Sequence, residues 1–147
     1  MKKILIPPVF VFISLFLMVL FYFLLPGFNR ILFPFNLTGI LFIWGGIVIM
    51  GKSRDLFRKH NTTLGIKPSS ALITEGVFSK TRNPMYLGMF LLLLGISVGF
   101  GNLLSMGTPF FFIMMMRLIF IPKEEKMMFE VFGDEYLHYK KQVGRWL

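Results

Sequence analysis

Three polar segments of this sequence lie beside long apolar stretches, and they hold the side chains that could do chemistry. The first, 82–86, reads Arg-Asn-Pro-Met-Tyr, and the second is the carboxylate pair at 124–125. The third, 132–145, contains two tyrosines and ends in an arginine. Guanidinium, amide and phenol groups donate hydrogen bonds and carboxylates accept them, so together these segments offer partners to a charged, polar ligand.

Each segment taken alone also has a plain structural explanation. Asn83 can cap a helix that begins with Pro84, and Tyr86 is typical of a membrane interface. The two carboxylates follow Pro122, at a helix N-terminus where negative charge is favourable. The tail by itself is typical of an amphipathic helix lying on a membrane surface. The combination of the three segments, rather than any one of them, favours a binding site.

The apolar stretches that must position these segments predict an all-α integral membrane protein with a single domain, 1–147. Of the 147 residues, 55% are hydrophobic, more than is usual in soluble domains. Crossing about 30 Å of hydrocarbon needs roughly 20 helical residues. The charge-free runs, the last of which ends before Arg117, predict four transmembrane helices: 4–25, 31–51, 86–100 and 103–121. A turn at 99–102 separates the last two, and Arg117 lies near the end of the fourth. A signal peptide is the alternative for the first run, but that run lacks a cleavage site of small residues.

The distribution of charge predicts the orientation in the membrane. Basic residues are concentrated in the loop 52–85 and in the tail 122–147, while Arg30 alone lies on the opposite side of the predicted bundle. By the positive-inside rule, the N-terminus, this loop and the tail are cytoplasmic. The net charge of +9 then reflects membrane orientation and contact with anionic membrane lipids rather than nucleic acid. The 0 cysteines and two distant histidines predict no metal site.

Helix packing follows from the same pattern. The first two predicted helices are joined by a short turn at 26–30, which predicts a hairpin. Gly39, Gly45 and Gly46 give the second helix a strip of small residues where a neighbouring helix can approach closely, and simple packing explains this strip. The third and fourth helices form a second hairpin, which brings 82–86 and 124–125 side by side.

The tail is too polar to span a membrane, and it predicts an amphipathic helix. Met128, Phe132, Tyr136, Tyr139 and Val143 recur at helical spacing and so share one face. The glycine at 133 is expected to interrupt this helix. Folded over the hairpin, the tail would cap a cofactor pocket with aromatic walls.

These motifs together resemble the isoprenylcysteine carboxyl methyltransferase family and, more loosely, phospholipid methyltransferases. The family's Arg-His-Pro-x-Tyr motif, hydrophobic hairpin and Glu-Glu pair are matched by 82–86, 87–121 and 124–125. The ending Phe-Gly-x-x-Tyr-x-x-Tyr is matched at 132–139. Asn83 stands where the family usually has histidine, and 76–79 lacks the frequent Pro-Tyr-Arg. The resemblance covers 59–145, more than half of the chain.

The resemblance implies methyl transfer from S-adenosylmethionine to a lipophilic small molecule or a lipidated substrate. It implies cofactor-binding roles for these side chains of the motif and the tail: Arg82, Asn83, Tyr86, Glu125, Tyr136 and Tyr139. It implies catalytic roles for Glu124, as a base for an amine or phenol acceptor, and for Arg145, which would orient a carboxylate acceptor.

Several alternatives stay open at this point. A membrane reductase that uses NADPH has a similar hairpin and cofactor cap, and a non-enzymatic membrane protein needs only the structural explanations given above. Isoprenoid acids, thiol-linked lipids, amines and phenols are all open as methyl acceptors. The sequence does not fix the oligomeric state.

Overall fold

Residues 7–61 and 71–147, which the computed structural model describes, fold into helices joined by turns, with no β-strand in those ranges. The predicted all-α class is therefore confirmed. Five α-helices are present in this part of the chain: α1 (Pro7–Leu24), α2 (Gly39–Lys59), α3 (Pro84–Phe100), α4 (Gly107–Met115) and α5 (Ile121–Gln142). Short 3₁₀ helices lie at Pro26–Phe28, Phe35–Thr38 and Gly76–Ser79. The start of the first predicted helix, 4–6, and the stretch 62–70 of the predicted loop lie outside the described residues.

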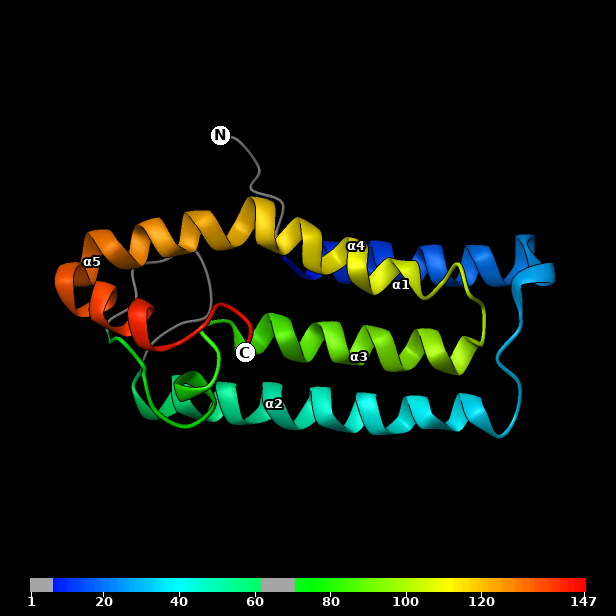
Figure 1. Ribbon diagram of the computed structural model, residues 1–147, viewed down its shortest axis with the longest axis horizontal. Coiled ribbons are helices and arrows are strands. Elements are labelled where there is room, and N and C mark those ends of the chain that lie inside the picture. The colour runs from blue at the N-terminus through cyan, green and yellow to red at the C-terminus, as the bar shows by residue number, and fades with distance from the viewer. Residues whose placement is uncertain (1–6, 62–70) are drawn as a thin grey trace.

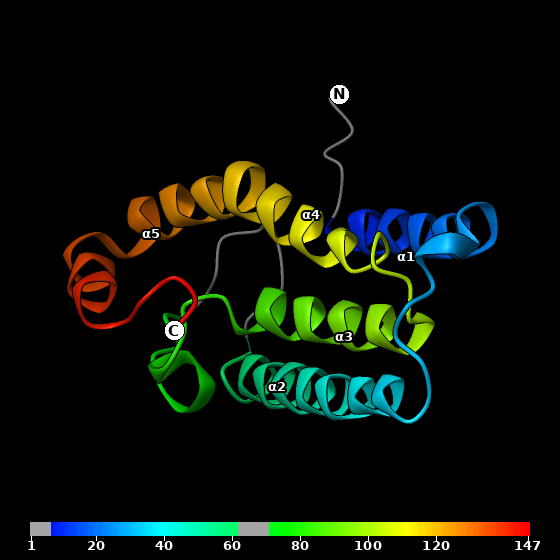
Figure 2. The same ribbon diagram turned by 45° about the vertical axis from the view of Figure 1, so that its right-hand side comes forward.

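Helix α3 lies at the centre of the bundle, with α2 on one side and α1 and α4 on the other (Figure 1). The turned view in Figure 2 shows the same order. Because α2 packs along α3 rather than along α1, the predicted hairpin of the first two helices is wrong. The connection 25–38 crosses the end of the bundle from α1 to α2, and α2 begins at Gly39 rather than at 31.

Glycine pairs explain why α2 prefers α3. A Cβ atom added to Gly46 would lie 2.6 Å from the carbonyl oxygen of Gly88, which is too close for a real side chain. A Cβ atom added to Gly39 would clash with the carbonyl oxygen of Gly95 in the same way. The two helix backbones therefore touch at two places, two turns apart on each helix. Such contacts let small residues hold helices together where the surrounding lipid gives no hydrophobic driving force. Gly45, in contrast, faces open space.

The turn between α3 and α4 is fixed by a buried amide. Gly101 adopts a left-handed conformation (φ +68°), which ends α3. Asn102 is fully buried, and its side-chain nitrogen donates to the carbonyl oxygens of Phe21 and Leu25 at the end of α1, at 3.3 and 3.2 Å. This side chain therefore ties α1 to the turn at the end of the bundle that carries the connection 25–38.

Helices α4 and α5 form one continuous rod rather than a span followed by a separate tail. A π-helical turn, Met116–Phe120, joins them, and Pro122 sits in the first turn of α5. Proline lacks an N–H group and its ring crowds the carbonyl four residues earlier, and a wider π turn accommodates both effects. The rod bends at Gly133 (φ +53°, ψ −125°), where the sequence predicted an interruption.

Two helical segments are long and apolar enough to cross a membrane, Pro7–Leu24 and Phe35–Lys59, and α3 is a shorter apolar helix. Large apolar side chains point outward from both, among them Phe16 (66% exposed) and Trp44 (67% exposed). An outward-facing apolar surface of this kind belongs in lipid rather than in water. These helices indicate a membrane protein. The second one extends through Arg58 and Lys59, so the first part of the predicted loop 52–85 is helical.

Candidate functional site

The three chemistry-bearing segments meet at one end of the bundle. The start of α3, the first turn of α5 and the chain after α5 lie together there, and the C-terminus returns to the start of α3 (Figure 1). The bend at Gly133 makes this return possible because it turns the second half of α5 back towards α3. All eight predicted site residues lie in this cluster.

Glu125 is the centre of an ion-pair network. Its carboxylate accepts a hydrogen bond from Arg82 Nη1 at 2.9 Å and a two-pronged contact from Arg145 Nε and Nη2, each at 2.9 Å. Lys140 Nζ adds a weaker contact at 3.3 Å. The side chains of Arg82 and Glu125 are only 9% and 12% exposed, so this pair is shielded from water. Two-pronged arginine–carboxylate contacts fix both partners in orientation.

Backbone carbonyls of the C-terminal segment complete the contacts of the motif. Arg82 Nε donates to the carbonyl oxygen of Val143 at 3.0 Å. Asn83 Nδ2 and Thr81 Oγ1 both donate to the carbonyl oxygen of Arg145, at 2.9 and 3.2 Å. Trp146 packs against the buried core beyond them. The sequence analysis missed Thr81 and Trp146; the position of Thr81 next to the motif was the available signal, and nothing local marked Trp146.

Glu124 faces the other way, into the bundle. The hydroxyl of Tyr86 donates to Glu124 Oε1 at 2.5 Å, and Tyr86 is only 8% exposed. Burial raises the pKa of the Glu124 carboxyl above its ordinary value, and the hydrogen bond from Tyr86 offsets part of this rise. Burial also acts on Glu125, but hydrogen bonds from Arg145 and the charge of Arg82 outweigh it, and the pKa of Glu125 falls below its ordinary value. The pKa values of the two adjacent carboxyl groups are thus shifted in opposite directions.

The two tyrosines of the tail are buried at the base of the cluster. Tyr139 donates to the carbonyl oxygen of Phe78 at 2.6 Å, which fastens the tail to the 3₁₀ turn Gly76–Ser79. Tyr136 accepts a hydrogen bond from Arg82 Nη1 at 3.3 Å. Burial raises the pKa of both phenols, and the charge of Glu125 adds to the effect at Tyr136. Both hydroxyls therefore stay protonated at neutral pH.

Four polar positions of the cluster make no hydrogen bond with any described residue. They are Arg82 Nη2, Asn83 Oδ1, Glu124 Oε2 and the hydroxyl hydrogen of Tyr136. A guanidinium nitrogen and a phenol can bind a carboxylate, while a carboxylate oxygen and an amide oxygen can accept from an ammonium or a hydroxyl. No group of three or more metal-ligating side chains occurs among the residues the structure describes.

Comparison with known proteins places these residues in a family. The profile of the phospholipid methyltransferases matches residues 35–135, which include both the motif at 82–86 and the carboxylate pair. The chain belongs to the phospholipid methyltransferase family. The family resemblance inferred from the sequence is confirmed. Tyr136, Tyr139 and Arg145 lie just beyond the matched segment.

Individual relatives are similar over shorter stretches. An uncharacterised protein of Haemophilus influenzae is 40% identical over 63 residues, which are 43% of this chain and all of the relative. The protein-S-isoprenylcysteine O-methyltransferases of Schizosaccharomyces pombe and Saccharomyces cerevisiae are 34% and 37% identical over 74 and 73 residues. These stretches are about half of this chain and span only 30% of each yeast enzyme.

Proposed function

We propose that the chain transfers a methyl group from S-adenosylmethionine to a lipophilic acceptor at the membrane surface. One observation carries the proposal: in a member of this family, Tyr86–Glu124 and Arg82–Glu125 form two buried polar pairs side by side at the end of an apolar bundle. Polar pairs at the end of apolar helices are suited to a reaction between a charged cofactor and a lipid.

The chemistry of the donor set fits this cofactor. Its carboxylate would be held by Arg82 Nη2 and by the hydroxyl of Tyr136, which have no partner among the described residues. Its ammonium would be held by Glu124 Oε2 and Asn83 Oδ1. When bound, S-adenosylmethionine supplies an electrophilic methyl group on a sulfonium, so the protein's task is to bind, to orient and to exclude water.

Glu124 and Glu125 divide the remaining work. Glu125 is saturated by Arg82, Arg145 and Lys140, so it holds the site together rather than contacting a ligand. Glu124 Oε2 has no partner among the described residues, so it can help to hold the cofactor's ammonium when the acceptor is a carboxylate. With an amine or a phenol acceptor, Asn83 Oδ1 alone would hold the ammonium, and Glu124, whose pKa is raised, would take the proton. A carboxylate acceptor needs no base. Arg145, which the sequence analysis assigned to the acceptor, acts in this proposal as a positioning residue through Glu125.

We assign four membrane spans, formed by α1, Phe35–Lys59, α3 and the rod of α4 with the π turn. The cytoplasmic face is the one that carries the site. Arg58 and Lys59 end α2, and Lys80 follows the turn that Tyr139 binds, so these residues lie at that end of the bundle. Arg30, in the connection 25–38, lies at the opposite end, where its backbone N–H donates to Gly101 after α3. This asymmetry agrees with the positive-inside rule. The site would then face both the cytoplasm, where the cofactor is found, and the edge of the bilayer.

The acceptor class to test first is an S-prenylated cysteine with a free carboxylate. The support is the printed function of the two yeast relatives, protein-S-isoprenylcysteine O-methyltransferase. Lipid amines and phenols form the second group to test, because the matched family is that of phospholipid methyltransferases and Glu124 can serve as a base.

Ligand-dependent thermal unfolding tests the proposal. A ligand at about 100 times its dissociation constant adds roughly 2.7 kcal/mol to the native state. Purified protein in mild detergent should be stabilised by S-adenosylmethionine and S-adenosylhomocysteine but not by NADPH. Glu124→Gln should abolish the shift, whereas Glu130→Gln, an exposed glutamate on the same helix, should retain it. Stabilisation by NADPH alone would replace the proposal with a reductase, and equal shifts in both variants would remove Glu124 from the site.

A further inference from the structure

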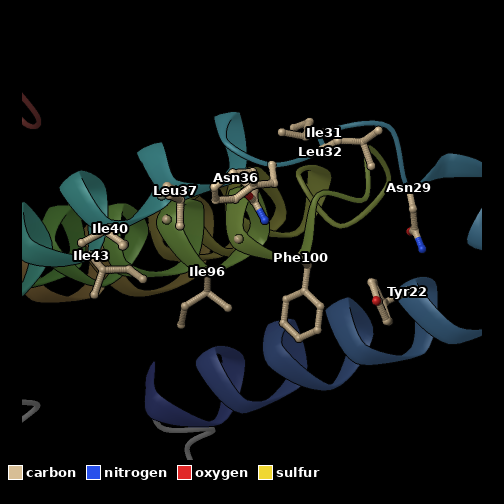
Figure 3. Close-up of a pocket in the computed structure, with 14 residues that line it drawn as sticks. Tyr22, Asn29, Ile31, Leu32, Asn36, Leu37, Ile40, Ile43, Ile96 and Phe100 are labelled. Atoms are coloured by element: carbon tan, nitrogen blue, oxygen red, sulfur yellow. The ribbon is translucent and has the colours of Figure 1, made fainter.

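A cavity lies at the opposite end of the bundle from the polar cluster. Its volume is about 720 Å³, within the range of about 300–1,000 Å³ that is usual for small-molecule sites. Helix α1 forms one side and α2 and α3 form the other, while residues of the connection 25–38 close its outer end (Figure 3). Along α3, Gly99 in its wall is 13 residues from Tyr86, or about 20 Å. The cavity is therefore separate from the proposed methyl-transfer site.

The walls of this cavity divide into an apolar part and a polar rim. Ile40 and Ile43 from α2 and Ile96 and Phe100 from α3 line the apolar part, and the last two project towards α1 (Figure 3). A gap of this kind exists because α1 packs on α3 and α4 while α2 packs on the other side of α3. The outward-facing surfaces of these helices are apolar, so in the proposed membrane topology the cavity would open into hydrocarbon.

The polar rim carries hydrogen-bonding groups with no partner among the described residues. Asn36 Oδ1 is buried and accepts no hydrogen bond. Asn29 Oδ1 accepts from Asn102 at 2.7 Å, but the side-chain nitrogen of Asn29 donates to no described group. Tyr22 brings a hydroxyl that is likewise unpaired in the described part of the chain. A buried polar atom without a partner, such as Asn36 Oδ1, costs about 1–3 kcal/mol, so a ligand that donates to it gains that stabilisation on binding. Asn29 is half-buried and Tyr22 is exposed, so their groups offer hydrogen bonds to a ligand without this penalty.

We propose that this cavity binds a phospholipid from the membrane leaflet opposite the methyl-transfer site. Its acyl chains lie against Ile43, Ile96 and Phe100. Its glycerol-ester and phosphate oxygens accept from the side-chain amides of Asn29 and Asn36, and a hydroxyl of its headgroup donates to Asn36 Oδ1. Arg30 lies between two lining residues and is exposed, so it supplies the positive charge that a lipid phosphate requires at this surface.

Two matched glycine substitutions isolate the cavity. Gly99 lines it, and a Cβ atom added there meets nothing within 4 Å, so Gly99→Phe is expected to place its ring in the cavity. Gly45, also within a helix, has equally open space but lies outside the cavity lining, so Gly45→Phe is the control. Both variants change helix propensity in the same direction. Their unfolding temperatures show whether each remains folded.

Native mass spectrometry of delipidated protein titrated with phosphatidylglycerol measures the binding directly. The wild type and Gly45→Phe should retain one lipid, and Gly99→Phe should retain it at least about tenfold more weakly. Asn36→Leu should weaken retention by about three- to tenfold, because it removes hydrogen bonds to the lipid but keeps the volume of the side chain. Equal retention by all four proteins would overturn the proposal. Dimers that Gly99→Phe abolishes would overturn it as well, since the cavity would then be a contact between two copies of the chain.

Discussion

Replacing Glu125 with glutamine should damage the stability of the protein far more than the same change at its neighbour Glu124. Glu125 accepts hydrogen bonds from Arg82, Arg145 and Lys140, which come from three separate parts of the site. Glutamine has the same shape but no charge, so the two guanidinium groups would lose their counter-ion without any change in packing. Glu124 contacts only the neutral hydroxyl of Tyr86 among the described residues.

The solvent exposure of each charged partner determines how much stability Glu125→Gln should cost. Removing one member of a buried ion pair costs about 3–5 kcal/mol. Arg82 and Glu125 are 9% and 12% exposed, but Arg145 is 32% exposed, which weakens its share through solvent screening. Glutamine also keeps one acceptor oxygen. The expected loss is therefore about 2–3 kcal/mol, at or below the lower limit of that range. For a chain of 147 residues this corresponds to a fall in Tm of roughly 6–10 °C.

The pH dependence of this loss carries the stronger test. Because the folded state lowers the pKa of Glu125 from its ordinary value of 4.5, the carboxylate stabilises the fold above pH 4.5. That contribution disappears as the pH falls through the lowered pKa. The difference in Tm between wild type and Glu125→Gln should be constant from pH 6 to 8 and should shrink below pH 4.5. Thermal unfolding in detergent over this range measures it.

Two further variants test whether the ion pairs of Glu125 are what stabilises the fold. Glu124→Gln should leave Tm at pH 7 unchanged or slightly raised, because burial already disfavours the charged form of that carboxyl. Glu130→Gln, an exposed glutamate, controls for the loss of charge on the helix. If Glu125→Gln and Glu130→Gln lower Tm equally, or if the effect of Glu125→Gln does not vary with pH, the ion-pair network does not stabilise the site.

Three further predictions concern contacts that hold the helices and the tail together, and thermal unfolding checks each of them. Gly46→Leu should destabilise the protein by about 3 kcal/mol or more, because its Cβ atom would lie 2.6 Å from a backbone oxygen of α3. Gly45→Leu, whose Cβ atom meets nothing, should be tolerated. Equal losses of stability in the two variants would show that α2 and α3 are not in close contact. Asn102→Ala should cost about 2–3 kcal/mol, since it leaves buried backbone groups of α1 and the turn without partners, and an unchanged Tm would mean that this end of the bundle is held by other contacts. Tyr139→Phe should cost about 1–2 kcal/mol through loss of its hydrogen bond to the carbonyl of Phe78, with no such loss for the exposed Tyr22→Phe.

The sequence predicted the helical class and the residues that gather at one end of the bundle, because those features depend on local patterns. Charge-free runs marked the apolar helices, and the segments 82–86 and 124–125 flank a hairpin, so their proximity follows from connectivity alone. Each of these inferences needed only the distance along the chain between a polar segment and the end of an apolar run.

Features that depend on contacts between distant segments were not predictable in the same way. The choice of α3 rather than α1 as the partner of α2 rests on Gly46 meeting Gly88, and a glycine strip on one helix does not identify the facing helix. The rod through Pro122 depends on the π turn before it, whereas proline in a sequence ordinarily marks a helix boundary. The carbonyl oxygens of the C-terminal segment carry no sequence signal, because every residue has one.

The different environments of Glu124 and Glu125 follow from this continuous rod. Successive residues of a helix point about 100° apart, so two adjacent carboxylates on a rigid helix cannot face the same partner. One faces Tyr86 on α3 and the other faces Arg82 and Arg145. Because Glu125 neutralises these arginines, no described cation pairs with Glu124, and burial is left to raise its pKa. The ion pair therefore does more than hold the tail: it keeps the arginines of the protein away from the carboxyl that would act as the base for an amine or phenol acceptor.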